Sequence, residues 1–381
     1  MRHFKLLLII ILIFVFGCKN SSFDAKKEQK VPEKQTLGLD YAQGFRVKPT
    51  DNGYELEVFN PWQGAKNVNY KYKLIERQQL SKTDSAENAI PIPISRAICL
   101  STTHIAYIDQ LNSSATIVGV SGSDFVSSSA VRQLIREGKV SDVGYEQSIN
   151  YELVLSLKPD VVFSYGVGAE AAGYLHKLHD LDIPVVFVGD YLETSPLGKA
   201  EWLKFFGAML GREKMADSLF TIIENDYVDT RSIVENSQTK PNVFINLPWN
   251  DTWYFPGGNS YMANLIRDAG GNYSLSHLDG NSSHPFSIES ALVKGMEADV
   301  WINTGSAESL HEISSNFPQL KVLPVFRSGN VYNSIKRTNK LGGNDFYESG
   351  AVKPNLILKD LVKIFYPDSI EHELVYFQKL E

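Results

Sequence analysis

Two glutamates occupy matching points of two distant segments, and their carboxylates are the first candidates for chemistry. In NYELVLSLKPDVVFS (150–164) Glu152 follows Asn150, and in SIESALVKGMEADVWIN (287–303) Glu289 follows Ser287. Asn and Ser are preferred helix N-caps, so both glutamates are expected in the first turn of a helix that leads into a strand. A carboxylate there stabilises its own helix, and an exposed one can also bind an arginine of a partner through two hydrogen bonds.

His104, Asp124 and Glu146 are the candidates for reactions inside a site. His104 closely follows the apolar run RAICLS (96–101), and its imidazole can ligate a metal or hydrogen-bond a ligand, or simply be satisfied by backbone at a helix start. Asp124 and Glu146 would act as an acid/base pair only if the fold brought them together. No G-x-S-x-G, P-loop or H-E-x-x-H motif occurs, so the sequence gives no positive sign of an enzyme. Catalysis is kept as an alternative, which turnover of a candidate ligand would reveal.

Direct binding of zinc or manganese is the other alternative, and it needs three or four His, Asp or Glu ligands converging in one place. His176 and His179 are expected on an outer helix, whereas His277 and His284 lie in a glycine- and serine-rich stretch. No histidine-rich loop is present. We therefore assign no metal ligands.

These side chains must be positioned by alternating strands and helices. Strands are expected at 97–100, 116–120, 161–163, 185–188, 243–247, 300–303 and 331–333, with helices near 103–112, 129–137, 151–157, 170–180, 259–269, 287–294, 306–314 and 351–365. Alternation predicts α/β folding around parallel sheets, whose ligand sites lie beyond the carboxyl ends of the strands. Residues 199–236 lack proline and keep helical spacing, so they predict a long helical connection that Gly207 and Gly211 break into a short and a long helix.

A small β extension precedes this body. Between about 40 and 80 the runs GFRVKP and YELEVFN flank Asp51-Asn52-Gly53, a strong hairpin signal, and NVNYKYKLIE alternates again. The polar, proline-bearing stretch SKTDSAENAIPIPISR (81–96) is interpreted as a linker. No function follows from the extension.

The first residues have the character of a processing signal. Arg2 and Lys5 precede an unbroken apolar run, Leu6 to Phe16, which is too short to span a bilayer comfortably. The run stops at Gly17-Cys18 and resembles a bacterial lipobox, which predicts lipidation of Cys18; the alternative is an uncleaved anchor helix. Residues 19–36 are interpreted as a flexible tether. The chain is therefore expected outside the cytoplasm, attached to a membrane.

Composition limits the remaining classes. The net charge of −7 at pH 7 and the absence of lysine- and arginine-rich runs argue against a nucleic-acid partner and a polybasic membrane patch. Cys99 is the only other cysteine, so no intramolecular disulfide is expected once Cys18 is lipidated. The apolar core must hold the fold.

Four segments together resemble the class III substrate-binding proteins of bacterial ABC importers, the cobalamin- and iron-siderophore-binding family. They are RAICLSTTHIAYIDQLNSSATIVGVSGSDF (96–125), NYELVLSLKPDVVFS (150–164), WYFPGGNSYMANLIRDAGGNY (253–273) and FSIESALVKGMEADVWINTG (286–305). The resemblance covers roughly residues 95–365 and implies two Rossmann-like lobes joined by one long helix. With the segments read from the residues above, the expected division is a signal peptide (1–17), a tether (18–36), the β extension and linker (37–94), a first lobe (95–195), the connecting helix (196–238) and a second lobe (239–381). The β extension lies outside the part that the resemblance covers.

The resemblance also implies a monomer without a cofactor, which holds its ligand in a largely preformed cleft between the lobes. Glu152 and Glu289 would dock onto arginines of the permease, one lobe on each transmembrane subunit. The ligand would be an iron chelate (siderophore or haem) or cobalamin, which needs aromatic walls and a few oriented polar groups. The expected ligand-binding residues are Thr103, His104, Phe125, Tyr145, Glu146, Tyr165, Trp249, Trp253, Arg337, Asn344 and Tyr347.

Overall fold

The computed structural model describes residues 37–80, 89–145, 148–166, 177–178 and 180–381. The predicted signal peptide and tether, with Cys18, lie outside the described residues, as do Glu146, His176 and His179. The helix expected at 170–180 falls largely outside them as well.

The first lobe contains a five-stranded, wholly parallel sheet in the order β7-β6-β5-β8-β9. Its strands are β5 (Ala97–Cys99), β6 (Ile117–Val120), β7 (Ser141–Asp142), β8 (Val161–Ser164) and β9 (Val185–Phe187). Its described helices are α1 (Thr102–Gln110), α2 (Ser129–Arg136) and α3 (Tyr151–Leu157), with 3₁₀ turns η1 (Ser114–Thr116), η2 (Ser123–Phe125) and η5 (Asp190–Leu192). All residues of β5, β6 and β8 are buried, as expected for a parallel sheet covered on both faces.

The second lobe contains a sheet in the order β12-β10-β14-β15-β16, parallel except for its last strand. The strands are β10 (Asn242–Ile245), β12 (Asn272–Tyr273), β14 (Val300–Ile302), β15 (Val331–Asn333) and β16 (Gln378–Lys379), and a separate antiparallel pair is formed by β11 (Thr252–Pro256) and β13 (Ser283–Ser287). The helical elements are α7 (Tyr261–Asp268), α8 (Ile288–Gly295), α9 (Leu310–Asn316), η6 (Pro318–Val322), α10 (Pro324–Arg327), α11 (Ser349–Val352) and α12 (Pro354–Phe365).

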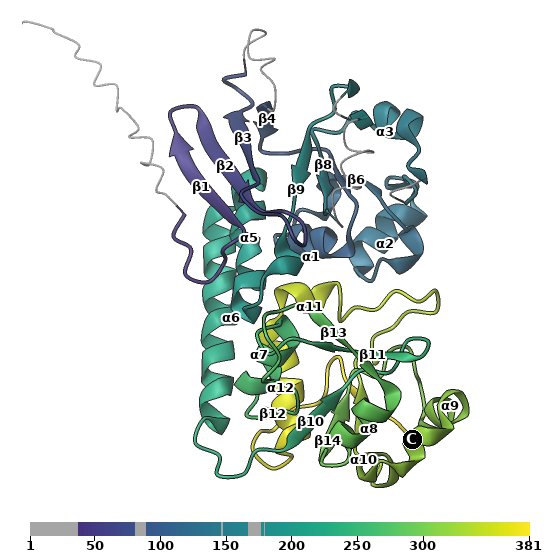
Figure 1. Ribbon diagram of the computed structural model, residues 1–381. Helices are drawn as coiled ribbons and strands as arrows, with labels where there is room; N and C mark the ends of the chain where they lie inside the picture. Colours follow the sequence, from purple (N-terminus) through teal and green to yellow (C-terminus); the bar gives the residue numbers. More distant parts are fainter. Residues whose placement is uncertain (1–36, 81–88, 146–147, 167–176, 179) are drawn as a thin grey trace, which may run out of the picture. The chain divides into compact units, whose positions relative to one another are not determined.

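Two helices connect the lobes, α5 (Pro196–Leu210) and α6 (Glu213–Val234). The predicted break occurs at Gly211, whose left-handed backbone (φ 63°) ends α5. Gly207 does not break the helix. A Cβ at this position would lie 2.6 Å from the Cβ of Ala216, so glycine allows α5 and α6 to pack closely. Helix α12 lies beside α6 (Figure 1). Lys359 of α12 forms an ion pair with Asp226 of α6.

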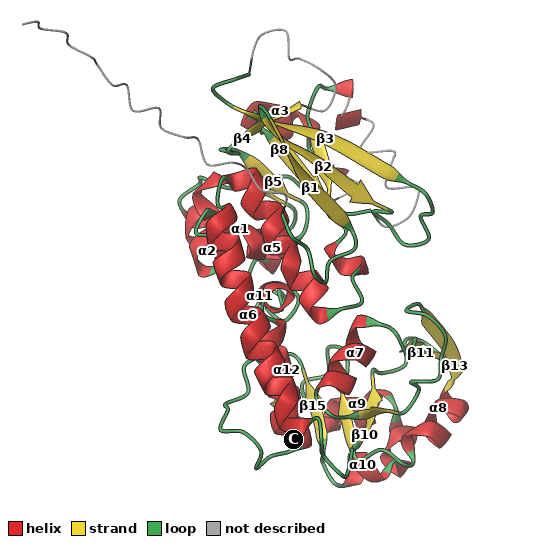
Figure 2. Cartoon of the chain, turned by 90° about the vertical axis from the view of Figure 1, so that its left-hand side faces the viewer, coloured by secondary structure: helices red, strands yellow, loops and turns green. Residues whose placement is uncertain are grey.

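The β extension forms a four-stranded sheet, seen among the strands near the top of Figure 2. Strands β1 (Phe45–Thr50), β2 (Gly53–Phe59) and β3 (Asn69–Glu76) are antiparallel, with the predicted turn between β1 and β2. The linker interpretation was wrong for Ala89–Ile92, because these residues form β4, parallel to β3. The rings of Tyr70 and Phe187 lie 4.7 Å apart, so this sheet covers the edge strand β9 of the first lobe.

Two buried glutamates hold the chain that enters this sheet. The Glu201 carboxylate accepts hydrogen bonds from the backbone N–H groups of residues 40, 41 and 42, and the Glu193 carboxylate accepts those of residues 43 and 44. Lys204 forms an ion pair with Glu201 at 2.9 Å. Because burying a charge is costly unless it is paired, these contacts tie residues 40–44 to α5 and to the segment just before it.

The predicted fold class is confirmed: each lobe is built on a mostly parallel sheet with accompanying helices, and long helices connect the two. Among the described residues, no helix is long and apolar enough to cross a membrane.

Candidate ligand site

A pocket of about 420 Å³ opens at the carboxyl ends of the second-lobe strands β10, β14 and β15. We call it the second-lobe pocket. It is lined by Asn246, Leu247, Pro248, Trp249, Tyr254, Asn303, Gly305, Ser306, Ala307, Glu312, Ile313, Asn316, Phe317, Asn333, Ser334 and Tyr347. This is the edge of a parallel sheet at which ligand sites form.

Three asparagines mark the ends of the three strands that form this edge. Asn246 and Asn303 directly follow β10 and β14, where both adopt left-handed backbone (φ 67° and 57°), and Asn333 is the last residue of β15. Asparagine tolerates this conformation better than most residues, which explains its use where a strand turns sharply. None of these three asparagines is among the site residues predicted from the sequence. The recurrence of Asn at the strand ends in VFIN, VWIN and VYN was the signal that could have found them.

The walls of the pocket are aromatic. Trp249 is 70% exposed, Tyr347 is 64% exposed and Tyr254 is 39% exposed, and all three line the pocket. Large exposed aromatic side chains offer stacking area to a ligand. Trp249 and Tyr347 are thus two predicted site residues that the structure brings together.

On the first lobe, Phe125 and Tyr145 form a second exposed aromatic group, with ring centroids 6.3 Å apart. Gly122 makes this arrangement possible, because a Cβ there would lie within about 3 Å of both rings. Tyr165 is half-buried, with its ring 6.5 Å from that of Tyr191.

Thr103 lies at the same carboxyl edge of the first-lobe sheet, where its hydroxyl donates to Asp190 at 3.4 Å. Asp190 is buried, which raises the pKa of its carboxyl, although Lys199 and two hydroxyl donors oppose the rise. Thr103 is therefore engaged in a contact within its own lobe.

Two predicted ligand residues are core residues instead. The ring of His104 is completely buried, with its centroid 6.1 Å from Phe163 and 6.3 Å from Phe206, and burial lowers its pKa to about 3. Its ring does not line the second-lobe pocket. Trp253 is also completely buried, and its indole N–H donates to the carbonyl of Ile245 at 3.0 Å. Alternation along β11 directs this side chain into the core.

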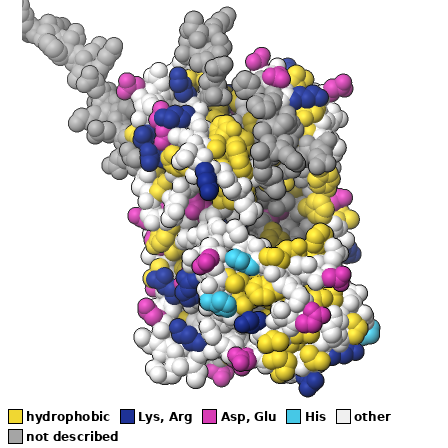
Figure 3. All heavy atoms as spheres, in the orientation of Figure 1, with side chains coloured by type: hydrophobic (Ala, Val, Ile, Leu, Met, Phe, Trp, Pro, Cys, Tyr) yellow, Lys and Arg dark blue, Asp and Glu magenta, His cyan; other side chains and the backbone are white. Residues whose placement is uncertain are grey.

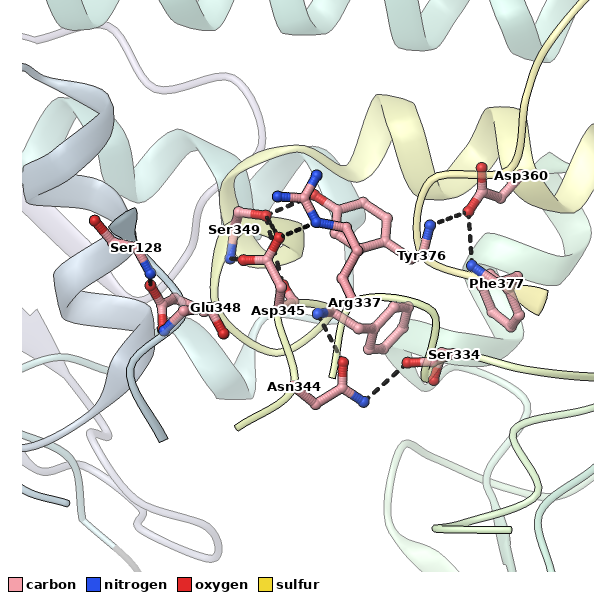
Figure 4. A network of polar contacts seen from close by, with 12 residues as sticks. Ser128, Ser334, Arg337, Asn344, Asp345, Glu348, Ser349, Asp360, Tyr376 and Phe377 are labelled. Carbon is pink, nitrogen blue, oxygen red and sulfur yellow. Dashed lines mark hydrogen bonds and ion pairs between the residues drawn. The ribbon is translucent and has the colours of Figure 1, made fainter. Parts of the chain in front are cut away.

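Arg337 and Asn344 support their own loop, residues 336–348, rather than an open site (Figure 4). Arg337 Nε lies 2.7 Å from a carboxylate oxygen of Asp345. The Asn344 side chain donates to the carbonyl of Ser334 and accepts the N–H of Phe346. The Arg337 side chain remains 54% exposed while its Nε is paired with Asp345, so its part in binding an anionic ligand stays a prediction.

The 336–348 loop also joins the second lobe to the first. Glu348 accepts the backbone N–H groups of Ser127 and Ser128, both at 2.6 Å, at the start of α2 (Figure 4). The Asn339 amide donates to the carbonyl of Asp124 at 3.0 Å. These bonds fix the loop against the segment that carries Phe125, so the two aromatic groups belong to one connected region.

Glu152 and Glu289 occupy the first turns of α3 and α8, as predicted. Asn150 caps α3 by accepting the N–H of Leu153, and Ser287 caps α8 by accepting the N–H of Ser290. Both glutamates are exposed. Within the described part of the chain, neither carboxylate has a hydrogen-bond or ion-pair partner, which leaves both available to another molecule.

Among the described residues, no group of three or more His, Cys, Asp or Glu side chains is arranged to hold a metal ion. On the face shown in Figure 3, lysine and arginine side chains are scattered among acidic ones rather than gathered in a basic surface.

Comparison with known proteins identifies the family. Residues 98–337 match the family model described as "Periplasmic binding protein". An uncharacterised lipoprotein of Methanocaldococcus jannaschii is 26% identical, with 98% of this chain and 94% of that protein covered.

Two solved structures share the fold. A periplasmic haem-binding protein of Pseudomonas aeruginosa has a TM-score of 0.58 at 17% identity, covering 76% of this chain and 98% of that one. A protein of an ABC-type Fe³⁺-hydroxamate transport system from Saccharomonospora viridis has a TM-score of 0.54 at 17% identity. The match covers 72% of this chain and 94% of that one. The chain belongs to the periplasmic binding proteins, the substrate-binding components of ABC importers.

Proposed function

We propose that this protein captures a metal chelate, namely a ferric siderophore, haem or cobalamin, and delivers it to an ABC permease without chemical change. The second-lobe pocket carries the proposal, since exposed aromatic walls at the carboxyl edge of a parallel sheet suit a large ligand. The haem-binding and Fe³⁺-hydroxamate proteins that share the fold support this ligand class. The exposed Phe125 and Tyr145 would complete the site from the first lobe.

Glu152 and Glu289 are the proposed docking residues for the two permease subunits. Each stands beside an exposed aliphatic side chain on the same helix face, Leu155 three residues after Glu152 and Val293 four residues after Glu289. An exposed carboxylate next to apolar surface suits recognition of a partner arginine, with the charge fixing orientation.

The protein is proposed to act as a monomer outside the cytoplasm, attached to a membrane through lipidated Cys18. Support comes from the lipobox-like sequence ahead of Cys18 and from the lipoprotein naming of a relative that spans nearly the whole chain. Lipid attachment can be checked by mass spectrometry of the membrane-extracted protein against a Cys18→Ser variant.

Ligand capture is tested by calorimetric titration of residues 19–381 with cobalamin, haemin and a panel of ferric siderophores. Saturable binding of one compound at one-to-one stoichiometry, with the ligand recovered unchanged, is the expected result. Failure of every chelate to bind would refute the proposal, and conversion of a ligand to product would favour an enzyme.

Docking is tested by the double variant Glu152→Ala with Glu289→Ala. We expect uptake by cells to be lost while ligand affinity and stability change little, because a first-turn glutamate contributes only about 0.3–1 kcal/mol to its helix. The matched control is Glu235→Ala with Glu297→Ala, which removes the same charge from two other exposed positions. Normal uptake by the docking variant, or loss of ligand affinity in it, would refute the assignment.

A further inference from the structure

The charged side chains that line the second-lobe pocket are acidic, and this limits the charge of the ligand that it can bind. We propose that the pocket receives an uncharged or positively charged part of the chelate that carries hydrogen-bond donors, and that it discriminates against anionic chelates. The inference rests on the ligand-capture function proposed above and specifies its substrate class.

The charges on the pocket wall are acidic only. Glu312 lines the pocket, and the described lining contains no lysine or arginine. One Glu312 carboxylate oxygen accepts the N–H of Glu308 at 2.9 Å, which holds the group in place and leaves its second oxygen for a ligand.

The asparagines at the strand ends use their donors elsewhere. The Asn246 amide donates to the carbonyl of Tyr254, and the Asn333 amide donates to the carbonyls of Gly305 and Ala307. By contrast, the side-chain oxygen of Asn303 is buried and accepts no hydrogen bond within the described structure. Two of the lining asparagines thus use amide donors on backbone carbonyls, while a third presents an unused acceptor.

The pocket lining offers no cation to balance an anionic ligand. Arg337 belongs to the loop that carries Tyr347, but it is not part of the lining, and its Nε is paired with Asp345 at 2.7 Å. An anionic chelate in the pocket would therefore place its charge near Glu312 with no lysine or arginine of the described lining beside it, which costs binding free energy.

A ligand group that is positively charged or carries hydrogen-bond donors can interact favourably with the pocket. It can donate to Glu312 and Asn303, and the exposed aromatic faces of Trp249 and Tyr347 attract cations. Ferric tris-hydroxamates, which are neutral or cationic, fit this description. Ferric tris-catecholates and haem with ionised propionates do not.

The test compares three ferric chelates of different charge by calorimetry on residues 19–381: cationic ferrioxamine B with its ammonium arm, a neutral cyclic tris-hydroxamate and anionic ferric enterobactin. We expect the cationic and neutral chelates to bind and the anionic one to bind at least tenfold more weakly. Tightest binding of the anionic chelate would overturn this inference and leave the ligand-capture function standing. No binding by any of the three would overturn this inference, and the ligand-capture function would fall as well only if cobalamin and haemin also failed to bind.

Glu312→Gln isolates the charge, since the amide oxygen can still accept the N–H of Glu308. We expect it to weaken the cationic chelate by roughly fivefold, as for a partly exposed charge pair, and to leave the neutral chelate unchanged. The matched control Glu308→Gln removes an exposed carboxylate outside the pocket lining. Equal effects of the two variants, or equal weakening of both chelates by Glu312→Gln, would contradict the inference.

Discussion

Glu348 provides the sharpest test of how the two lobes are joined. Its carboxyl group is buried, with the residue 2% exposed, and accepts two backbone N–H groups of the first lobe at 2.6 Å each. Burial raises its pKa from 4.5 to about 7, and the nearby Asp345 and Asp109 add to the rise, although the two N–H donors oppose it. The perturbation is Glu348→Gln, which removes the titration and keeps one acceptor oxygen.

The direction and magnitude of the effect of pH on the free energy of unfolding follow from proton linkage. The native state retains a proton on Glu348 that the unfolded chain releases above pH 4.5, so this contribution to stability is present below pH 4.5 and is lost as the pH rises through about 7. The difference between the two pKa values corresponds to about 3 kcal/mol. The free energy of unfolding of the native protein should therefore fall, relative to that of the variant, by about this amount between pH 4 and pH 8.

The assay is urea unfolding of both proteins across this pH range, followed by circular dichroism. Burial also raises the pKa values of Asp190 and Glu193, so a single profile mixes several groups. The difference between native protein and variant isolates Glu348, and Glu235→Gln at an exposed position serves as the control. A difference that stays constant within about 0.5 kcal/mol would refute the reasoning, since it would mean that the carboxyl titrates alike in the native and unfolded states.

Two further predictions concern the pocket and the loop. Trp249→Phe should abolish the ligand-induced change in tryptophan fluorescence, whereas Trp253→Phe should retain it, because only Trp249 is exposed in the pocket; the reverse pattern would place the ligand elsewhere. Gly343→Ala should destabilise the protein by about 1–3 kcal/mol in urea unfolding, because its Cβ would lie 2.3 Å from the carbonyl oxygen of Phe125 and 2.5 Å from the Asn339 amide nitrogen. An unchanged midpoint would show that the loop does not pack as described.

Local sequence determined the helices and strands well, because the relevant signals act over a few residues. Asn150 and Ser287 cap the helices that carry Glu152 and Glu289, as their types and spacing predict. Gly211 ends α5 because the left-handed backbone costs glycine little. Hydrophobic runs marked the buried parallel strands, although very short strands such as β7 and β12 carried no recognisable pattern.

The direction and partners of individual side chains depended on tertiary structure. His104 follows a strand, where a ligand residue would also stand, and only packing against Phe163 and Phe206 shows that its ring enters the core. Trp249 and Trp253 are four residues apart, yet one is exposed and the other buried.

Contacts between distant residues were likewise beyond the reach of local signals. Closure of the 336–348 loop brings Asp345 to Arg337, and alignment of three strands gathers the asparagines of the pocket edge. The sequence by itself therefore determined the family fold and the two exposed glutamates. The tertiary structure alone decided which of the predicted aromatic residues line the pocket and which charge lies beside them, because the lining comes from segments that meet only when the sheet assembles.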